Sequence, residues 1–332
     1  MRRCGPTLVR VLILCGATLI GSCSKPYHES NERYVFVATN INLPYWRNAE
    51  AGFLEAAKAL GVKAELVGPP AYQPHAELVM FRQVLEQNPA GICLSAARPE
   101  LFQAEIAQAI ARGIPVICVD ADVPGSKRVL YIGTDNVNAG RESLRRMAAL
   151  LSNKGNIAVI TIQGQNNLDD RVDGVAGALK NFPALKLVKI LDDKGDARST
   201  FDQVSELLQK KEKIDGIICL EATGGSGAAE ALHRLGMEGQ LPIVAFDDDP
   251  ETLDWIERGA IAATIAQKPY VMSYYGLKFL DDLHHNAVPL SQDWRTALAA
   301  PIPAFVDTGT VVVDKNNLKN YREGLPVHAK PM

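Results

Sequence analysis

Short apolar runs alternate with segments of helical periodicity along most of this sequence. The runs YVFVAT, KAELVG, GICLSA and PVICVD form a first series, and NIAVITI, LKLVKIL, DGIICLEA and LPIVAFD form a second. Apolar runs that alternate with helices are typical of βαβ units, in which a parallel sheet is buried between two layers of helices. The chain is therefore predicted to be an α/β protein with two doubly wound parallel sheets.

The two series also match each other in detail. GICLSA followed by IPVICVDADVP corresponds to GIICLEA followed by LPIVAFDDDP. Cys93 lies 27 positions before Asp120, and Cys219 lies 28 positions before Asp247. Each half is thus predicted to form a lobe with an Asp at the carboxyl end of a strand, where open α/β sheets bind ligands. Two such lobes that face each other would form a cleft between them.

Three further side chains are predicted to line this cleft. Tyr45 and Trp46 follow Pro44 at a strand-to-helix turn, in a chain that is only 6% aromatic. Glu221 lies between an apolar run and the glycine-rich stretch ATGGSGAAEAL. Carboxylates accept hydrogen bonds from hydroxyl groups, and aromatic faces cover the C–H faces of a sugar ring. The set therefore predicts a site for a polyhydroxylated ligand.

Each of these residues also has a purely structural interpretation. An Asp that ends a strand can cap the next helix or form an Asx-turn, and Tyr45 and Trp46 can belong to the core. The glycines after Glu221 can bend the start of a helix, and they are a weak indication of phosphate binding because no GxxxxGK[ST] pattern is present. The repetition of the Asp at matched positions favours a binding site.

Charge and motifs argue against several classes of function. The chain has 35 basic and 38 acidic residues and no basic stripe, so nucleic acid is not an expected partner. It has no GxSxG motif and no HExxH motif, and its histidines are scattered, so we do not expect an enzyme, a cofactor or a metal site. Paired carboxylates would also suit a glycosidase, which is the enzymatic alternative. The histidines, to which structural or surface roles are assigned, are His28, His75, His233, His284, His285 and His328.

The chain starts with an expected export signal. MRRCGPTLVRVLILCGATLIGSCSK has a basic start, an apolar run and small residues before a cysteine, and the apolar run is shorter than the roughly 20 residues that span a bilayer. IGSC resembles the cleavage box of bacterial lipoproteins, in which the cysteine becomes the lipidated first residue. We therefore expect a signal peptide at residues 1–22, a lipid anchor at Cys23 and a linker at 23–32. A plain secretory signal is the alternative.

Three cysteines remain once the signal and the anchor are set aside. Cys93, Cys118 and Cys219 each lie within an apolar run. A disulfide between Cys93 and Cys118 is conceivable in an oxidising compartment, but neighbouring parallel strands rarely offer its geometry. Buried free thiols are the favoured interpretation.

From Val35 to about Leu318 the sequence resembles the periplasmic sugar-binding proteins of ABC transporters. The resemblance is to the ribose-binding type, whose fold is shared with the ligand domains of lactose-repressor-like regulators. It rests on GVAGAL preceded by Arg171, on YIGTDNVNAG, on GAIAATIAQKPYVMSYYGLKFL and on FVDTGTVVVDKNNL. It implies a type I periplasmic binding protein, in which two similar lobes are joined by a three-strand hinge near Thr134, Gln267 and Val306. The implied lobes are residues 33–134 with 268–305, and 135–267 with 306–332.

The resemblance also implies a set of ligand contacts. Ribose-type members often carry an Arg after the Asp of the fourth strand, where this chain has Ala121 and Asp122, and an Asn at the position of Glu221. These departures favour a neutral or amine-bearing sugar or polyol other than ribose. The implied contacts are Asn42, Tyr45, Trp46, Asp120, Arg171, Glu221, Asp247 and Gln267.

The resulting functional prediction is an extracytoplasmic solute-binding lipoprotein. It would capture a sugar or polyol as a monomer, held at the membrane through its lipid anchor, and deliver it to the permease of an ABC transporter. The alternative is a sugar-sensing input module for a membrane receptor or histidine kinase. A transcriptional regulator of the same fold would carry a helix-turn-helix head where this chain has the export signal.

Overall fold

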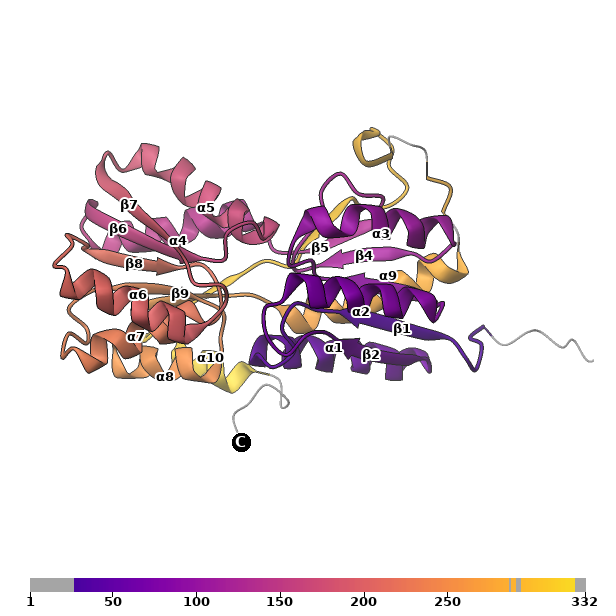
Figure 1. The fold of residues 1–332 in the computed structure, drawn as a ribbon, viewed down its shortest axis with the longest axis horizontal. Coiled ribbons are helices and arrows are strands. Elements are labelled where there is room, and N and C mark those ends of the chain that lie inside the picture. The colour runs from indigo at the N-terminus through magenta and orange to yellow at the C-terminus, as the bar shows by residue number, and fades with distance from the viewer. Residues whose placement is uncertain (1–26, 287, 291–293, 326–332) are drawn as a thin grey trace, which may run out of the picture.

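The computed structural model describes residues 27–286, 288–290 and 294–325, which form two α/β lobes side by side (Figure 1). The expected signal peptide and Cys23 lie outside these residues. None of the helices within the described ranges is both long and apolar enough to cross a membrane.

The first lobe is built on a parallel sheet in the order β11-β5-β4-β3-β1-β2. Successive residues of β1 point to opposite faces, so Phe36 packs under helices α1 and α9, and Val35 and Val37 pack under α2 and α3. The strands are β1 (Arg33–Val37), β2 (Lys63–Val67), β3 (Gly91–Leu94), β4 (Val116–Val119), β5 (Leu130–Gly133) and β11 (Phe305–Asp307). The helices are α1 (Pro44–Leu60), α2 (Pro74–Glu86), α3 (Pro99–Ala111) and α9 (Pro269–His285).

The second lobe repeats this order as β12-β10-β9-β8-β6-β7, with β12 antiparallel to β10. Helices α4 and α5 cover one face of the sheet, and α6, α7 and α8 cover the other, with α10 beside α8. The strands are β6 (Lys154–Thr161), β7 (Ala184–Asp192), β8 (Gly216–Cys219), β9 (Ile243–Phe246), β10 (Ala263–Ala266) and β12 (Val311–Asp314). The helices are α4 (Asn136–Leu150), α5 (Asn166–Ala178), α6 (Ala197–Gln209), α7 (Gly224–Arg234), α8 (Pro250–Arg258) and α10 (Leu318–Gly324).

The predicted pair of similar doubly wound lobes is therefore confirmed. The central strands β3, β4, β8 and β9 are buried along their whole length, which is why their sequences are continuous apolar runs. Proline at the first helical position sets the start of five of the helices described here, and Gly61, in the left-handed region at φ 75°, ends α1. The parallel strands of both sheets point their carboxyl ends toward the other lobe, and only the antiparallel β12 runs the opposite way within the described sheets (Figure 1).

Three connections join the lobes, after β5, after β10 and between β11 and β12. They are hydrogen-bonded to one another: the Thr134 hydroxyl donates to the Gln267 side-chain oxygen over 2.8 Å, and the Thr308 backbone N–H donates to the Gly133 carbonyl over 2.8 Å. Asp307 still pairs with Gly133 in the first sheet, so this sheet extends past the division expected between residues 305 and 306.

The three cysteines are free and buried in the described part of the chain. Cys93 on β3 pairs with Ile117 of β4, and Cys118 is the next residue. Because adjacent strand residues point to opposite faces, Cys93 packs with the α1 and α9 face and Cys118 with the α2 and α3 face. The favoured interpretation of buried free thiols agrees with this arrangement.

Candidate ligand-binding cleft between the lobes

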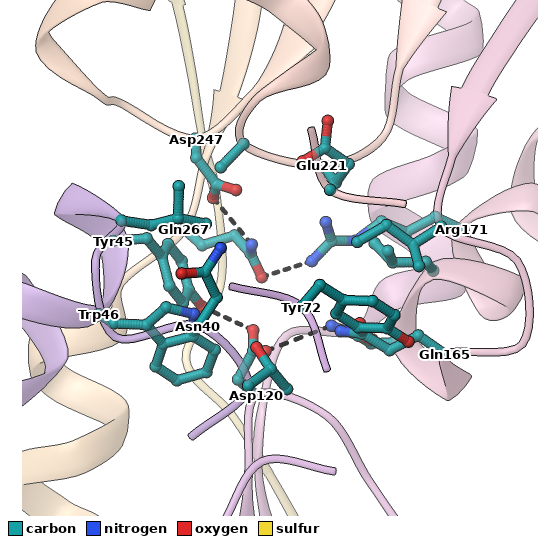
Figure 2. Close-up of a pocket in the computed structure, with 17 residues that line it drawn as sticks. Asn40, Tyr45, Trp46, Tyr72, Asp120, Gln165, Arg171, Glu221, Asp247 and Gln267 are labelled. Atoms are coloured by element: carbon teal, nitrogen blue, oxygen red, sulfur yellow. Dashed lines mark hydrogen bonds between the residues drawn. The ribbon is translucent and has the colours of Figure 1, made fainter. Parts of the chain in front are cut away.

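A cavity of about 480 Å³, counted with its opening to solvent, lies between the lobes where the carboxyl ends of the two sheets face each other (Figure 2). Seventeen residues line it, and they come from both lobes and from the second connection. Pockets for small ligands often occur at such junctions. Seven of the eight predicted site residues line the cavity: Tyr45, Trp46, Asp120, Arg171, Glu221, Asp247 and Gln267.

Asp120 and Asp247 occupy equivalent positions in the two lobes. Each follows the fourth strand of its sheet in the left-handed region, at φ 66° and 65°. Each backbone N–H donates over 3.0 Å to the next strand, to the carbonyl of Ile132 or Ile265. Asp tolerates this conformation better than most residues. The carboxylates bond to side chains that line the cleft, so the helix-capping interpretation does not apply to them.

The Asp120 carboxylate accepts hydrogen bonds from both lobes. The Tyr45 hydroxyl donates to its Oδ1 over 2.6 Å, and the Ser95 hydroxyl donates to its Oδ2 over 3.2 Å. The Asn167 amide, which belongs to α5 of the second lobe, donates to the same Oδ2 over 3.4 Å. One first-lobe carboxylate thus bridges the cleft.

The Asp247 carboxylate is held by a network around Gln267. The Gln267 amide donates to Asp247 Oδ1 over 2.8 Å, and its oxygen accepts from Arg171 Nη2 over 2.7 Å. Arg171 is 1% exposed and also donates to the Asn136 side chain and to the Leu220 carbonyl. These contacts hold the guanidinium in a fixed position at the back of the cleft.

Burial shifts the pKa values of the acidic groups upward. Burial raises the pKa of Asp247 to about 7, against the opposing effect of the Arg171 guanidinium. Burial also raises the pKa of Asp120, again opposed by Arg171 and then by the Tyr45 hydroxyl. The pKa of Tyr45 lies well above its ordinary value, because of its burial and the nearby carboxylates, so its hydroxyl remains a donor.

Glu221 is a buried carboxyl group in the wall of the cavity. Burial raises its pKa far above the ordinary value, and the adjacent Asp193 carboxylate, with which it shares a hydrogen bond, raises it further. Its other contacts are with Thr223, whose backbone N–H donates to Oε2 over 2.8 Å. Burial therefore favours the neutral form of Glu221 over a third negative charge beside Asp120 and Asp247.

The glycine-rich stretch after Glu221 is needed for close packing. A Cβ on Gly224 would lie 2.8 Å from Glu221 Oε1, and a Cβ on Gly227 would lie 2.4 Å from the Ala197 carbonyl oxygen. The glycines thus lie at the start of a helix, as expected, since α7 begins at Gly224, and the distances show that they allow close approach there.

Tyr45 and Trp46 belong both to the core and to the cavity wall. They are 6% and 4% exposed, and Trp46 makes edge-to-face contacts with Phe36 and Tyr45 at ring-centroid distances of 5.9 and 5.1 Å. Both also line the cavity. The two alternative interpretations of this pair are therefore both partly right.

Asn42 is the predicted site residue that does not line the cavity. It is exposed, and its amide donates to the Pro70 carbonyl over 3.0 Å, because the turn before α1 directs it away from the cleft. Asn40 points into the cavity in its place (Figure 2). Both residues occur in the stretch TNINLPYW, and no pattern in it distinguishes one from the other.

Sequence reasoning also missed Tyr72, Gln165 and Asn167. All three lie in or next to loops after the carboxyl ends of β2 and β6, so the general rule on strand ends could have pointed to them. The Gln165 amide donates to Asn167 Oδ1 over 3.0 Å, while Gln165 Oε1 is buried and accepts no hydrogen bond from the part of the chain that the structure describes. This oxygen is available to a ligand hydroxyl.

A second contact crosses the cleft at the start of α1. Asp249, just after Asp247 and Asp248 in the second lobe, accepts a hydrogen bond from the Tyr45 backbone N–H. The residue before α1 is Leu43, which has no side-chain acceptor, so this carboxylate from the other lobe satisfies a donor at the helix end.

Known proteins resemble this chain over most of its length. Residues 34–286 match the family described as periplasmic binding protein domain. The D-allose-binding periplasmic protein of Escherichia coli (strain K12) is 25% identical, over 83% of this chain and 92% of its own. Two solved structures are also similar. The sugar-binding protein of a sugar ABC transporter from Bacillus halodurans is 34% identical with a TM-score of 0.78, and the match covers 87% of this chain and 100% of that one. AraP, an arabinose-binding protein from Geobacillus stearothermophilus, is 36% identical with a TM-score of 0.73, and the match covers 88% of this chain and 99% of that one.

Proposed function

The chain belongs to the periplasmic binding protein family, and we propose that it captures a sugar or polyol between its lobes for delivery to the permease of an ABC transporter. The observation that carries this proposal is the pair of matched carboxylates, Asp120 and Asp247, which point into one cavity from the two lobes (Figure 2). A ligand with hydroxyl groups on opposite sides can donate to both. The arabinose-binding and allose-binding names of similar proteins support the same class of ligand.

The proposed roles follow from the donors and acceptors in the cavity. Asp120 and Asp247 accept hydrogen bonds from sugar hydroxyls, and Gln165 Oε1 adds a further acceptor. An Arg side chain has five N–H groups, and the contacts of Arg171 described above use three, so it can also donate to a ring or hydroxyl oxygen. Trp46 and Tyr72 supply apolar ring surface.

The charge of the site favours a neutral or amine-bearing ligand. When Asp120 and Asp247 are ionised, they outweigh the single positive charge of Arg171, and Glu221 adds none. A sugar acid would place its carboxylate beside two others, which is unfavourable in a buried cavity. Neutral monosaccharides, polyols and amino sugars remain as the proposed substrate class.

Closure of the lobes is the proposed signal to the membrane partner. The contacts from Asn167 to Asp120 and from Tyr45 to Asp249 can form only when the lobes meet. A ligand that touches both lobes favours this closed arrangement by the contacts that it gains there. We further propose that the chain is exported and held at the membrane by a lipid on Cys23.

A thermal-shift screen of purified protein against neutral sugars, polyols, amino sugars and sugar acids tests the binding proposal. A ligand present at a hundred times its dissociation constant adds about 2.7 kcal/mol to the free energy of unfolding. We expect a neutral or amine-bearing compound to raise the melting temperature, and Asp247→Ala to abolish the shift. Asn42→Ala is the matched control because Asn42 is exposed and outside the cavity. A screen in which only sugar acids bind would contradict the proposal.

The membrane protein that the sugar-loaded chain activates distinguishes delivery to a permease from sensing by a receptor. In proteoliposomes that contain the permease and ATPase encoded beside this chain, the sugar-loaded protein should stimulate ATP hydrolysis more than the sugar-free protein. Stimulation of a histidine kinase, with no effect on any ATPase, would favour the sensing alternative.

A further inference from the structure

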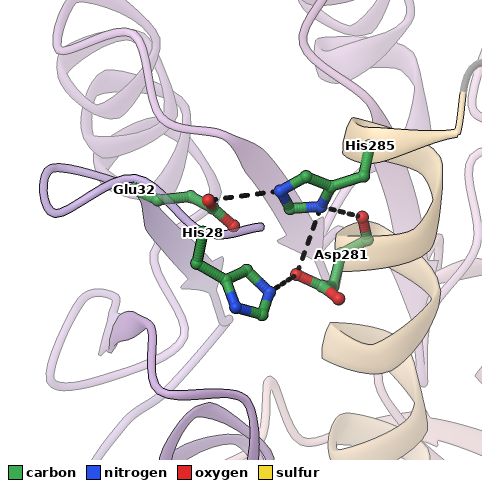
Figure 3. Close-up of side chains that lie close together, drawn as sticks. All are labelled: His28, Glu32, Asp281 and His285. Atoms are coloured by element: carbon green, nitrogen blue, oxygen red, sulfur yellow. Dashed lines mark hydrogen bonds and ion pairs between the residues drawn. The ribbon is translucent and has the colours of Figure 1, made fainter. Parts of the chain in front are cut away.

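Two histidines and two carboxylates of the first lobe lie close together (Figure 3). His28 and Glu32 precede β1, and Asp281 and His285 lie on the last turns of α9. Since β1 starts at Arg33 and its carboxyl end faces the cleft, this cluster lies at the opposite end of the sheet. It is separate from the proposed sugar site.

The potential ligand atoms of these four side chains all lie within 4.8 Å of one another. His28 Nε2 is 2.9 Å from Asp281 Oδ1, and His285 Nε2 is 3.3 Å from Glu32 Oε2. In a tetrahedral zinc site with bonds of about 2.0–2.2 Å, neighbouring ligand atoms are about 3.4 Å apart. The cluster is therefore close to the size that such a site requires.

The two carboxylates are deeply buried next to each other. The side chains of Glu32 and Asp281 are 2% and 7% exposed. The Tyr34 hydroxyl lies 2.8 Å from Glu32 Oε1 and 3.2 Å from Asp281 Oδ1, but it has a single proton to donate. Two buried carboxylates call for positive charge beside them; the ion pairs with the histidine rings provide one source, and a divalent cation bound between the four side chains would provide another.

The histidine rings are oriented as metal ligands are. His285 Nδ1 lies 2.8 Å from the Asp281 carbonyl oxygen and donates its proton there, while Nε2 faces Glu32 Oε2 over 3.3 Å, where a cation would take the place of a proton on Nε2. A bond from the second ring nitrogen to a backbone carbonyl is the usual support of a metal-bound His. Tyr27 stacks on the His285 ring at a centroid distance of 4.3 Å and holds it further.

We propose that His28, Glu32, Asp281 and His285 bind a divalent transition-metal cation, with zinc as the best match. Two imidazole nitrogens and two carboxylate oxygens are a donor set that zinc accepts, whereas calcium and magnesium prefer oxygen alone. Asp281 and His285 are four residues apart on one helix, the spacing that places two ligands on the same face.

The proposed site would give His28 and His285 a role beyond the structural or surface ones expected from the sequence. Their partners are remote in the sequence, since His28 and Asp281 are 253 positions apart. A local spacing motif such as HExxH cannot reveal a site of this kind. The cation would join the segment before β1 to α9, the helix that follows the second connection between the lobes.

Isothermal titration of the full chain with zinc chloride, after treatment with EDTA and without a histidine tag, tests the proposal. We expect about one zinc ion per chain and a melting temperature that rises with zinc concentration. His28→Gln and His285→Gln should each weaken zinc binding at least about tenfold. His75→Gln, at an exposed position of α2, is the matched control and should bind zinc like the unaltered chain.

Two further readouts separate a metal site from a simple set of ion pairs. In EDTA, His28→Gln should melt within a few degrees of the unaltered chain, because His28 lies outside the sheet. The sugar-induced rise in melting temperature should be the same for His28→Gln and for the unaltered chain. The proposal is overturned if the EDTA-treated chain takes up no zinc, or if His28→Gln and the control bind it equally well.

Discussion

The side chain of Asn167, from the second lobe, donates a hydrogen bond over 3.4 Å to the carboxylate of Asp120, from the first. If the lobes open and close as proposed, this bond is made only when they meet, so Asn167→Ala should shift the ligand-free protein toward the open form by about 0.5–1.5 kcal/mol. Small-angle scattering should then show a larger radius of gyration for Asn167→Ala than for the unaltered protein. Asn42→Ala should leave the curve unchanged.

Addition of the cognate sugar should reduce the radius of gyration, and Asp247→Ala should diminish both the affinity and the compaction. Asp247 lies on the second lobe and gains its full set of ligand contacts only when the lobes meet. Identical scattering curves with and without a saturating sugar would rule out closure as the mechanism.

The raised pKa of Asp247, about 7, predicts that pH acts in opposite directions on affinity and on stability. The ionised carboxylate is the better acceptor for sugar hydroxyls, so affinity should increase about tenfold between pH 6 and pH 8. Calorimetric titration across this range measures it. Asp247→Asn should flatten the profile, and an unchanged profile in that variant would assign the effect to another group.

Stability of the sugar-free protein should follow the reverse course. Asp247 holds its proton more tightly in the folded chain than in the unfolded chain, where the ordinary pKa of 3.8 applies. Its contribution to the free energy of unfolding is therefore complete below about pH 4 and is lost as the pH rises through about 7. Urea unfolding at pH 5 and pH 8 measures this change. The free energy of unfolding should differ more between the two pH values for the unaltered protein than for Asp247→Asn.

Trp46 should affect both binding and stability, because its ring lines the cavity and packs on Phe36. Trp46→Ala should lower the free energy of unfolding by about 3–5 kcal/mol, and Trp46→Phe by less. Sugar affinity should fall by about 1–3 kcal/mol for the Ala variant through loss of ring contact. Chemical denaturation and titration calorimetry of the same samples measure the two effects, and a variant with full affinity would show that the ring does not contact the sugar.

The proposed anchor makes a prediction about cell fractionation. Cys23→Ser should leave the protein exported but soluble, because the residue that would carry the lipid is gone. The unaltered protein should remain in the membrane fraction after a carbonate wash. A Cys23→Ser protein that also remains there would point to a different anchor.

The duplicated architecture could be predicted because every strand buried on both faces has to be apolar, and the order of such runs repeats. The equivalence of Asp120 and Asp247 could be predicted for the same reason, since each follows one of these runs. Arg171 and Gln267 depended on the family resemblance. Their hydrogen bonds join a helix to a lobe connection, and such contacts leave no local pattern.

The remaining features depend on geometry that short-range patterns do not contain. The choice between Asn40 and Asn42 is made by the turn before α1. The raised pKa of Glu221 is caused by burial and then by Asp193, which lies just after the end of a different strand. The cluster of two histidines and two carboxylates brings together residues 28 and 32 with residues 281 and 285, which are about 250 positions apart in the sequence.

The three connections between the lobes have a consequence for the order in which the chain can fold as it is synthesised. The first sheet is covered on one face by α9, whose Met272 and Leu277 pack in the same core as Phe36. Its edge strand β11 comes later still. Domains usually fold in the order in which they emerge, the N-terminal one first. Here the first lobe cannot be completed before Asp307 has left the ribosome, and the second lobe still waits for β12 and α10, which follow it in the chain. The N-terminal lobe therefore cannot finish well ahead of the other, and the two lobes are completed almost together at the end of synthesis.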